Sequence, residues 1–330
     1  MVERPLADES ALFQELERLA AAGRHRDVLE ALERLPATVR EGRTRPALLA
    51  AEAYGRLGDH DAAVHWAELA RAVARTRGER HAELRARNYQ GLIALRHGDI
   101  DEAERHFTAA LEMARALADH TTEARCLNNL GILANIRGDH EIALANYRLA
   151  LVAYQQVGHV RGIAETHHNI GISLRDQGNP RAALGAAEEA VRLATQAGDE
   201  QLVALASTGR AELHVALDDP ALARAELQRA EDRYTRIGLQ AGLPEVWRVQ
   251  AAVARSARDY SAAVSWLERA ARLATEYGST DTLADIERDL SISLAASGDD
   301  DGARAAQERA VVLYRKIGAV RAAERLVSRQ

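Results

Sequence analysis

Glycine and aspartate recur every 40 residues along most of this chain, and this interval constrains the fold more than any other feature. The turn signals lie at positions 58–59, 98–99, 138–139, 178–179, 218–219, 258–259 and 298–299. A second series of breaks falls midway between them, at Gly78, Asp119, Gly158, Gly198, Gly238, Gly278 and Gly318. Such a period is typical of repeat architectures, in which each unit is one supersecondary structure.

The segments between the breaks have helical periodicity. After Gly138-Asp139, the apolar residues from Ile142 to Ala153 recur at steps of three and four. Glycine can end a helix in the left-handed conformation, and the Asp or Asn that follows can cap the next helix. Pro180 and Pro220 each stand at the first position of an expected helix, where proline is tolerated. The pattern therefore predicts an all-α fold of helix-turn-helix units.

Small residues hold fixed places in every unit. Seven residues before each turn lies Ala51, Gly91, Gly131, Gly171, Ala211, Ala251 or Ser291, and the segment after each turn carries alanines such as Ala143 and Ala150. A small residue at the same point of each helix lets two helix backbones approach closely. Larger apolar residues such as Phe107 and Tyr147 lie between the alanines. One pair of helices cannot bury its own apolar face, but a stack of pairs can.

These positions resemble those of the tetratricopeptide repeat, including the tryptophan that the family favours at the place of Trp247. Leu127 to Gly131 and His168 to Gly171 resemble the long, 40-residue variant of kinesin light chain, the spindle-orientation adaptors and the helical arms of bacterial regulators. The resemblance implies a right-handed superhelical α-solenoid of about eight repeats and a C-terminal capping helix. It implies one solenoid over residues 1–330: a divergent repeat (1–42), seven 40-residue repeats (43–318), and a capping helix with its tail (319–330).

Composition excludes several classes of protein. No apolar run approaches the roughly 18 residues that a membrane span needs, and residues 1–10 lack the apolar core of a secretory signal. A net charge of −6 argues against nucleic acid or an anionic membrane as the main partner. The one cysteine, Cys126, is expected to be buried between helices and cannot form an internal disulfide. We therefore expect a cytoplasmic protein.

In the resembling family, the first helix of each pair lines a concave groove that binds a partner. The residues that this resemblance places in the groove are Arg85, Asn88, Tyr89, Arg96, Arg125, Asn128, Asn129, Asn135, His168, Asn169 and Arg175. Asparagine offers a donor and an acceptor, so a ladder of asparagines can pair with an extended peptide backbone. The alternative is that these asparagines bond to their neighbours across the helix stack.

Arginines form a second candidate feature of the groove. Arg85, Arg96 and Arg125 predict a basic strip, for which an acidic peptide or a C-terminal carboxylate is a natural ligand. Lys316 is the one lysine among 43 basic residues, so arginine is the default surface cation here and a solvated face is the alternative. Trp66 and Trp266 share one register position, either to contact a partner on the convex face or to pack on a neighbouring helix.

The sequence contains no motif that is typical of an enzyme. His60 and His65 are five residues apart and His167 and His168 are adjacent, so neither pair has the spacing of metal ligands on one helical face. Glycine-rich phosphate loops and nucleophile elbows are absent, and the expected turns are too short to carry a catalytic group. We expect no metal, no cofactor and no catalytic residues.

The sequence thus predicts a non-enzymatic scaffold or adaptor whose groove takes a peptide segment or a helix of another protein. Two alternatives stay open. One is a regulatory sensor arm that acts on a separate output protein, since residues 1–35 are too short for a DNA-binding domain. The other is a structural protein that assembles with copies of itself.

Overall fold

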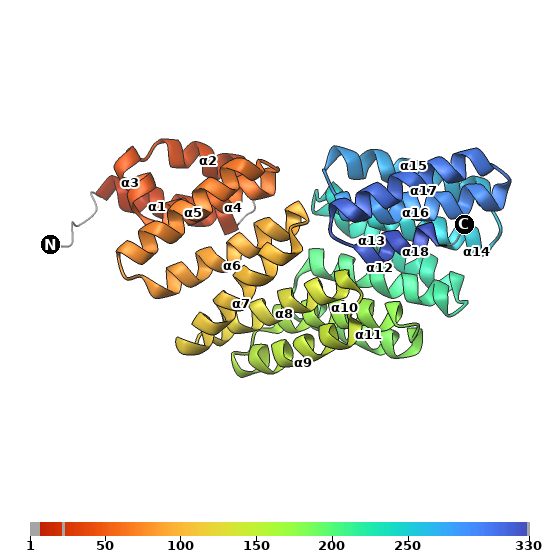
Figure 1. The fold of residues 1–330 in the computed structure, drawn as a ribbon, viewed down its shortest axis with the longest axis horizontal. Coiled ribbons are helices and arrows are strands. Elements are labelled where there is room, and N and C mark those ends of the chain that lie inside the picture. The colour runs from red at the N-terminus through yellow and green to blue at the C-terminus, as the bar shows by residue number, and fades with distance from the viewer. Residues whose placement is uncertain (1–6, 22–23, 329–330) are drawn as a thin grey trace. The chain divides into compact units, whose positions relative to one another are not determined.

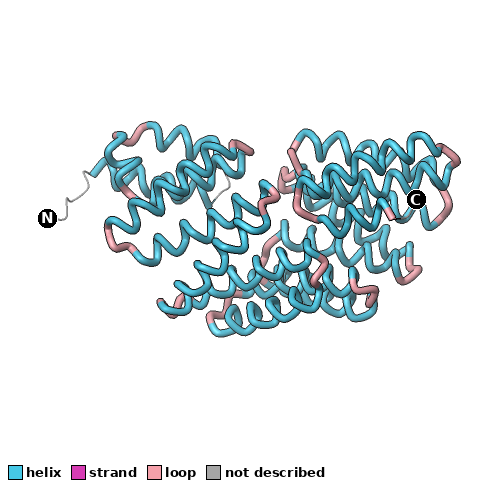
Figure 2. Tube along the Cα trace, viewed as in Figure 1, coloured by secondary structure: helices cyan, strands magenta, loops and turns pink. Residues whose placement is uncertain are grey.

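A computed structural model describes residues 7–21 and 24–328, and these residues form helices joined by short turns (Figures 1 and 2). The helices are α1 (Ala7–Ala21), α2 (His25–Glu33), α3 (Ala37–Gly42), α4 (Thr44–Leu57), α5 (His60–Thr76), α6 (Arg80–His97), α7 (Ile100–Ala116), α8 (His120–Arg137), α9 (His140–Gln156), α10 (Val160–Asp176), α11 (Pro180–Gln196), α12 (Glu200–Ala216), α13 (Pro220–Arg236), the 3-10 helix η1 (Gln240–Gly242), α14 (Leu243–Ser256), α15 (Tyr260–Glu276), α16 (Thr280–Ser297), α17 (Asp300–Lys316) and α18 (Val320–Val327). Over these residues the prediction of an all-α fold of about eight pairs and a final helix is confirmed.

The chain divides into two compact units, residues 1–122 and 123–330, with the boundary inside α8. A single solenoid over residues 1–330 stays a prediction. The predictions of a divergent first repeat, of a C-terminal tail and of no secretory signal depend partly on residues 1–6, 22–23 and 329–330. These residues lie outside the described residues.

The unit of residues 1–122 begins with the divergent pair α1 and α2. Leu16 and Leu19 of α1 pack with Val28 and Leu32 of α2 and with Leu49 of α4. The short helix α3, which the sequence pattern did not predict, precedes α4. The pairs α4–α5 and α6–α7 follow. In each pair we call the first helix the A helix and the second the B helix.

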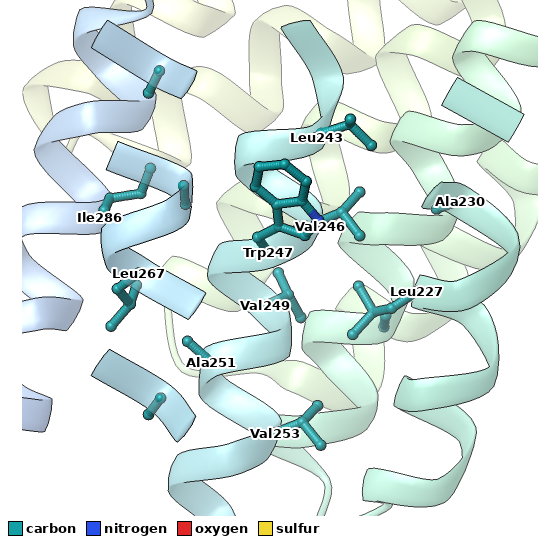
Figure 3. Packing of buried hydrophobic residues seen from close by; sticks show 14 of the residues in the cluster. Leu227, Ala230, Leu243, Val246, Trp247, Val249, Ala251, Val253, Leu267 and Ile286 are labelled. Atoms are coloured by element: carbon teal, nitrogen blue, oxygen red, sulfur yellow. The ribbon is translucent and has the colours of Figure 1, made fainter. Parts of the chain in front are cut away.

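The unit of residues 123–330, here called the C-terminal unit, contains most of α8, then α9 and the pairs α10–α11, α12–α13, α14–α15 and α16–α17, followed by α18. Its largest core lies between α13, α14, α15 and α16 (Figure 3). Leu227, Val246, Val249, Leu267 and Ile286 are fully buried there. Alternate A and B helices contribute to this core, so each pair completes the core of the next.

The turns between helices follow the predicted capping chemistry. Gly58, Gly98 and Gly138 have φ values of 83°, 81° and 80°, and the amide that follows each bonds back five residues, as in Asp139 N to Ala134 O at 2.8 Å. Asp59 and Asp99 then accept hydrogen bonds from the amides of Ala62 and Glu102. This pairing of a left-handed residue with a cap explains why Gly-Asp recurs at the turn between the A and B helices.

Close approach of A and B helices depends on the small residues. A Cβ atom at Gly91 would lie 2.6 Å from the ring of Phe107, and one at Gly131 would lie 2.6 Å from Cδ1 of Tyr147. Both rings are almost completely buried. In these two pairs, the aromatic residue of the B helix therefore occupies the space that glycine leaves in its A helix.

Within the described residues, no helix has both the length and the apolar character needed to cross a membrane. Cys126 is buried, as expected.

Candidate functional site

The A helices of the C-terminal unit form the candidate binding surface. Successive A helices contact each other from α10 to α12, α14 and α16. Gly131, Gly171, Ala211 and Ala251 face the B helices, so residues on the other side of each A helix meet across the repeats. We call this the A-helix surface.

The predicted asparagines of this surface bond to each other. Oδ1 of Asn128 accepts hydrogen bonds from Nδ2 of Asn169 at 3.1 Å and from Oγ1 of Thr166 at 3.3 Å. Asn128 and Asn129 are each only 9% exposed, whereas Asn169 is half-buried. The structure therefore contains the bonding across the stack that was the alternative to a peptide ladder.

Asn135 lies at the C-terminal end of α8, in a second polar contact between A helices. Its Oδ1 accepts a hydrogen bond from Ser173 at 2.7 Å and lies 2.9 Å from Nδ1 of His140, while its Nδ2 lies 3.5 Å from a carboxylate oxygen of Asp176. Asn135 thus joins α8 to α10.

Alternating charges continue the surface from α10 to α16. Arg175 pairs with Glu212, and Arg248 donates hydrogen bonds to Glu212 at 2.8 Å and to Asp289 at 3.0 Å. Arg288 in turn bonds to Asp289 at 3.0 Å. These five residues, here called the charge ladder, link four consecutive A helices. Glu245 adds a further carboxylate to Arg248 at 2.6 Å.

Burial strengthens the electrostatic interactions between the residues of the charge ladder. Arg248 and Asp289 are each 3% exposed. Burial alone raises the pKa of Glu212, but the charges of Arg248 and Arg175 outweigh that effect and lower the pKa to about 2. Burial likewise opposes the charged form of Asp289, yet Arg288 and Arg248 lower its pKa. All members therefore stay ionised and paired at neutral pH.

His168 lies beside this ladder on α10. Burial, together with the charge of Arg175, lowers its pKa to about 4. Its ring carbon Cε1 lies 3.1 Å from where a Cβ of Gly209 would be, so the glycine lets the ring pack closely against α12. Neutral His168 is thus a packing residue between A helices.

Arg125 is the exposed basic residue that the sequence places on α8 of this surface. Its guanidinium interacts with the hydroxyl of Tyr154 and opposes the increase in the pKa of Tyr154 that burial causes. Arg175, by contrast, is half-buried and neutralised by Glu212 and Asp176.

The predicted residues of α6 belong to the other unit. Tyr89 donates a hydrogen bond to the carbonyl of Ala51 at 3.2 Å, and Arg96 donates to the carbonyl of Gly55 at 2.9 Å. Burial raises the pKa of Tyr89 to about 12, which keeps this hydroxyl a donor. Asn88 is buried and Arg85 is exposed.

Trp66 and Trp266 are half-buried and pack on neighbouring helices. Trp66 contacts apolar clusters of α4 and α6, with the guanidinium of Arg40 at 5.8 Å from its ring centroid. Trp266 packs against the core shown in Figure 3, and Arg269 lies 5.5 Å from its ring centroid.

The sequence pattern did not predict the charge ladder. Glu212, Arg248 and Asp289 carry a signal that could have revealed it, because opposite charges recur at intervals of 36 to 41 residues on A helices. Among the described side chains, no three His, Cys, Asp or Glu residues are grouped closely enough to hold a metal ion.

Comparisons with known proteins agree with the repeat fold. A family model described as the tetratricopeptide repeat matches residues 43–116 and 82–156, and a second such model matches residues 163–197. No curated protein matches the chain in sequence.

Solved structures of similar fold include bacterial regulators. A Rap protein complexed with competence and sporulation factor has a TM-score of 0.63 and 13% identity, covering 98% of this chain and 97% of its own. The apo form of the quorum sensor NprR from B. thuringiensis has a TM-score of 0.66 and 15% identity, covering 92% and 86%. The Rap conjugation gene regulator of plasmid pLS20, in complex with the Phr* peptide, has a TM-score of 0.69 and 14% identity, covering 85% and 76%. The periodic sequence, the paired helices and these matches together show a fold of tetratricopeptide-type repeats, and the family models match residues 43–156 and 163–197.

Proposed function

We propose that this chain is a non-enzymatic protein-interaction scaffold that binds a peptide segment or a helix of a partner along the A-helix surface of its C-terminal unit. The observation that carries the proposal is the continuity of that surface. The asparagine pair and the charge ladder tie α8, α10, α12, α14 and α16 together. A surface that is rigid before binding loses little conformational entropy when a ligand binds.

The surface also offers exposed apolar side chains. Leu205 of α12 is 37% exposed and Ile292 of α16 is 40% exposed, on helices whose other residues hold the ladder. Apolar anchors beside fixed polar groups are typical of sites that take an amphipathic segment. Arg125 is our proposed contact for a carboxylate of the ligand, and Asn169 for its backbone.

Two of the similar structures hold peptides or signalling factors, namely the Rap protein with competence and sporulation factor and the pLS20 regulator with Phr*. They support a peptide or protein partner for this chain too. The same likeness keeps a regulatory sensor arm as the second candidate, which differs in requiring that the ligand change the conformation of the chain.

Selection of linear peptides from a random displayed library on the full chain tests the proposal. Selected peptides are then titrated against Ile292→Glu and against Leu222→Glu, a matched variant on the B helix α13 where Leu222 is 50% exposed. We expect at least a tenfold loss of affinity for Ile292→Glu and no loss for Leu222→Glu. Equal binding to both variants, or no enriched peptide, contradicts the proposal.

A further inference from the structure

The C-terminal helix α18 touches a segment of the chain that lies about 180 residues earlier. Arg321 pairs with Asp139 in the turn between α8 and α9, with 2.8 Å between Nη1 and Oδ1. Ile136 of α8 packs against the cluster that contains Ala323 and Leu326. An open depression of about 560 Å³ is lined by Gly138, His140 and Asp176 and, from the C-terminal end of the chain, by Arg321, Glu324, Arg325 and Ser328. Within the C-terminal unit, α18 therefore bridges its first and last pairs.

Asp139 departs from its equivalents in the other repeats. The Asp or Asn at each equivalent position accepts a hydrogen bond from the amide three residues later, namely Asp59, Asp99, Asn179, Asp219, Asp259 and Asp299. Asp139 makes no such bond, and its carboxylate binds Arg321 instead. Release of α18 would free Asp139 to cap α9, which partly offsets the loss of the ion pair.

Few interactions hold α18 in place. It has eight residues and no side-chain N-cap, and a helix of this length is not stable in isolation. Its buried side chains are Ala323 and Leu326, with Ala319 just before the helix. Arg321 is more than half exposed, and an ion pair of this kind contributes little to stability. The helix is therefore held by docking alone and is able to detach locally.

The surface beneath α18 has a defined chemistry. Its floor consists of apolar side chains of α16 and α17, including Ala284, Val311 and Tyr314. Its rim carries the carboxylate of Asp139, and Asp176 lies across the depression. We propose that this surface, here called the α18 site, is a docking site for a short basic amphipathic helix of a partner protein, and that α18 is its resident occupant, displaced when the partner binds.

The resident helix indicates what the partner helix needs. Ala319, Ala323 and Leu326 give an apolar stripe of two small residues and a leucine at spacings of four and three, and Arg321 supplies the positive charge opposite Asp139. The α18 site lies on α16, α17 and the α8–α9 turn, and it meets the charge ladder at Tyr314, whose hydroxyl accepts a hydrogen bond from Arg288 at 3.0 Å. Binding at these elements goes beyond the scaffold function proposed above.

A peptide competition in the full-length chain tests this. The probe is a fluorescent, capped peptide of residues 318–328. Leu326→Asp replaces the buried leucine of α18, and Val327→Asp is the matched control because Val327 is 46% exposed. We expect the probe to bind the Leu326→Asp chain at least tenfold more tightly than the wild-type or Val327→Asp chain, since only Leu326→Asp vacates the site. Equal binding to all three chains overturns the proposal.

Charge reversal identifies the surface that the probe occupies. Asp139→Arg added to the Leu326→Asp chain is expected to weaken the probe about two- to fivefold, the range for an exposed ion pair, and an Arg321→Glu probe to recover the loss. If Asp139→Arg leaves the affinity for the probe unchanged, the assignment of the probe to the α18 site is wrong. Two-chain complexes in light scattering would also overturn it, because they would make a second copy the occupant.

Circular dichroism shows whether the Leu326→Asp chain folds. If it does not fold, a second measurement tests the proposal. Hydrogen exchange of residues 320–327 is then compared between wild type, Asp139→Arg, and Asp139→Arg combined with Arg321→Glu. Faster exchange in the single variant and recovery in the double variant support the proposal. Exchange that is the same in all three overturns it.

Discussion

At the residue scale, the stack is specified by complementary sizes at two register positions. Glycine in an A helix faces an aromatic ring of its B helix at Gly131 and Tyr147. At the same register 40 residues later, the atoms nearest to a Cβ at Gly171 would be the carbonyl oxygen of Ala183 at 3.5 Å and the amide nitrogen of Ala187 at 3.8 Å. Two glycines at equivalent positions thus have opposite tolerance for a methyl group.

We predict that Gly131→Ala destabilises the chain by about 2–4 kcal/mol, because the new methyl group forces the buried ring of Tyr147 to move. Gly171→Ala is the control. It introduces an ordinary contact and removes a helix-interior glycine, so we expect stabilisation of about 0.5–1 kcal/mol. Urea unfolding of the two variants measures the difference. Equal effects of the two substitutions would rule out this account of the packing.

At the element scale, the charge ladder decides how neighbouring A helices are held. Arg248 of α14 reaches Glu212 of α12 and Asp289 of α16, so one guanidinium joins three helices. The sequence places these residues on the A helices, but it cannot show that they pair with each other rather than with a ligand. That distinction depends on the distance between neighbouring repeats, which side-chain packing sets.

We expect Arg248→Met to cost about 3–5 kcal/mol of unfolding free energy, because it leaves the carboxylates of Glu212 and Asp289 buried without their shared cation. Arg272→Met, on the exposed face of α15, should change stability by less than about 0.5 kcal/mol. Denaturant titration of both variants at pH 7 gives the comparison. A loss for Arg248→Met no greater than that for Arg272→Met would show that the ladder contributes little.

His168 gives the A-helix surface a predicted pH response. Its pKa is about 4 in the folded chain and 6.5 in the reference state, so between these values the unfolded chain binds a proton that the folded chain does not. The contribution of His168 to stability is therefore complete above pH 6.5 and declines as the pH falls towards 4. Over this range of pH, we expect the free energy of unfolding of the wild type to fall by on the order of 1–3 kcal/mol more than that of His168→Gln. Parallel slopes of stability against pH for the two chains would contradict the buried, neutral histidine.

At the scale of the whole molecule, the sequence predicts the order of the elements better than it predicts what the elements do together. The 40-residue interval and the Gly-Asp turns correctly place the helices from α4 to α17. Two features escape it. Apolar periodicity cannot show that Ile142, Leu149 and Val152 of α9 are more than half exposed, because it marks a helical face without naming its neighbour. Nor can it show that Arg321 meets Asp139, since that contact depends on the curvature accumulated over the repeats of the C-terminal unit.

Binding along several A helices should stabilise the repeats together, because each repeat is held by its neighbours. For a selected peptide at 100 times its Kd, linkage gives about 2.7 kcal/mol, which corresponds to an increase in Tm of about 5–10 °C for a unit of this size. A tenfold loss of affinity in Ile292→Glu should reduce this increase by about half at the same peptide concentration, while Leu222→Glu should retain it. Calorimetry of the three chains with and without peptide makes the measurement. An equal increase in Ile292→Glu would place the peptide away from the A-helix surface.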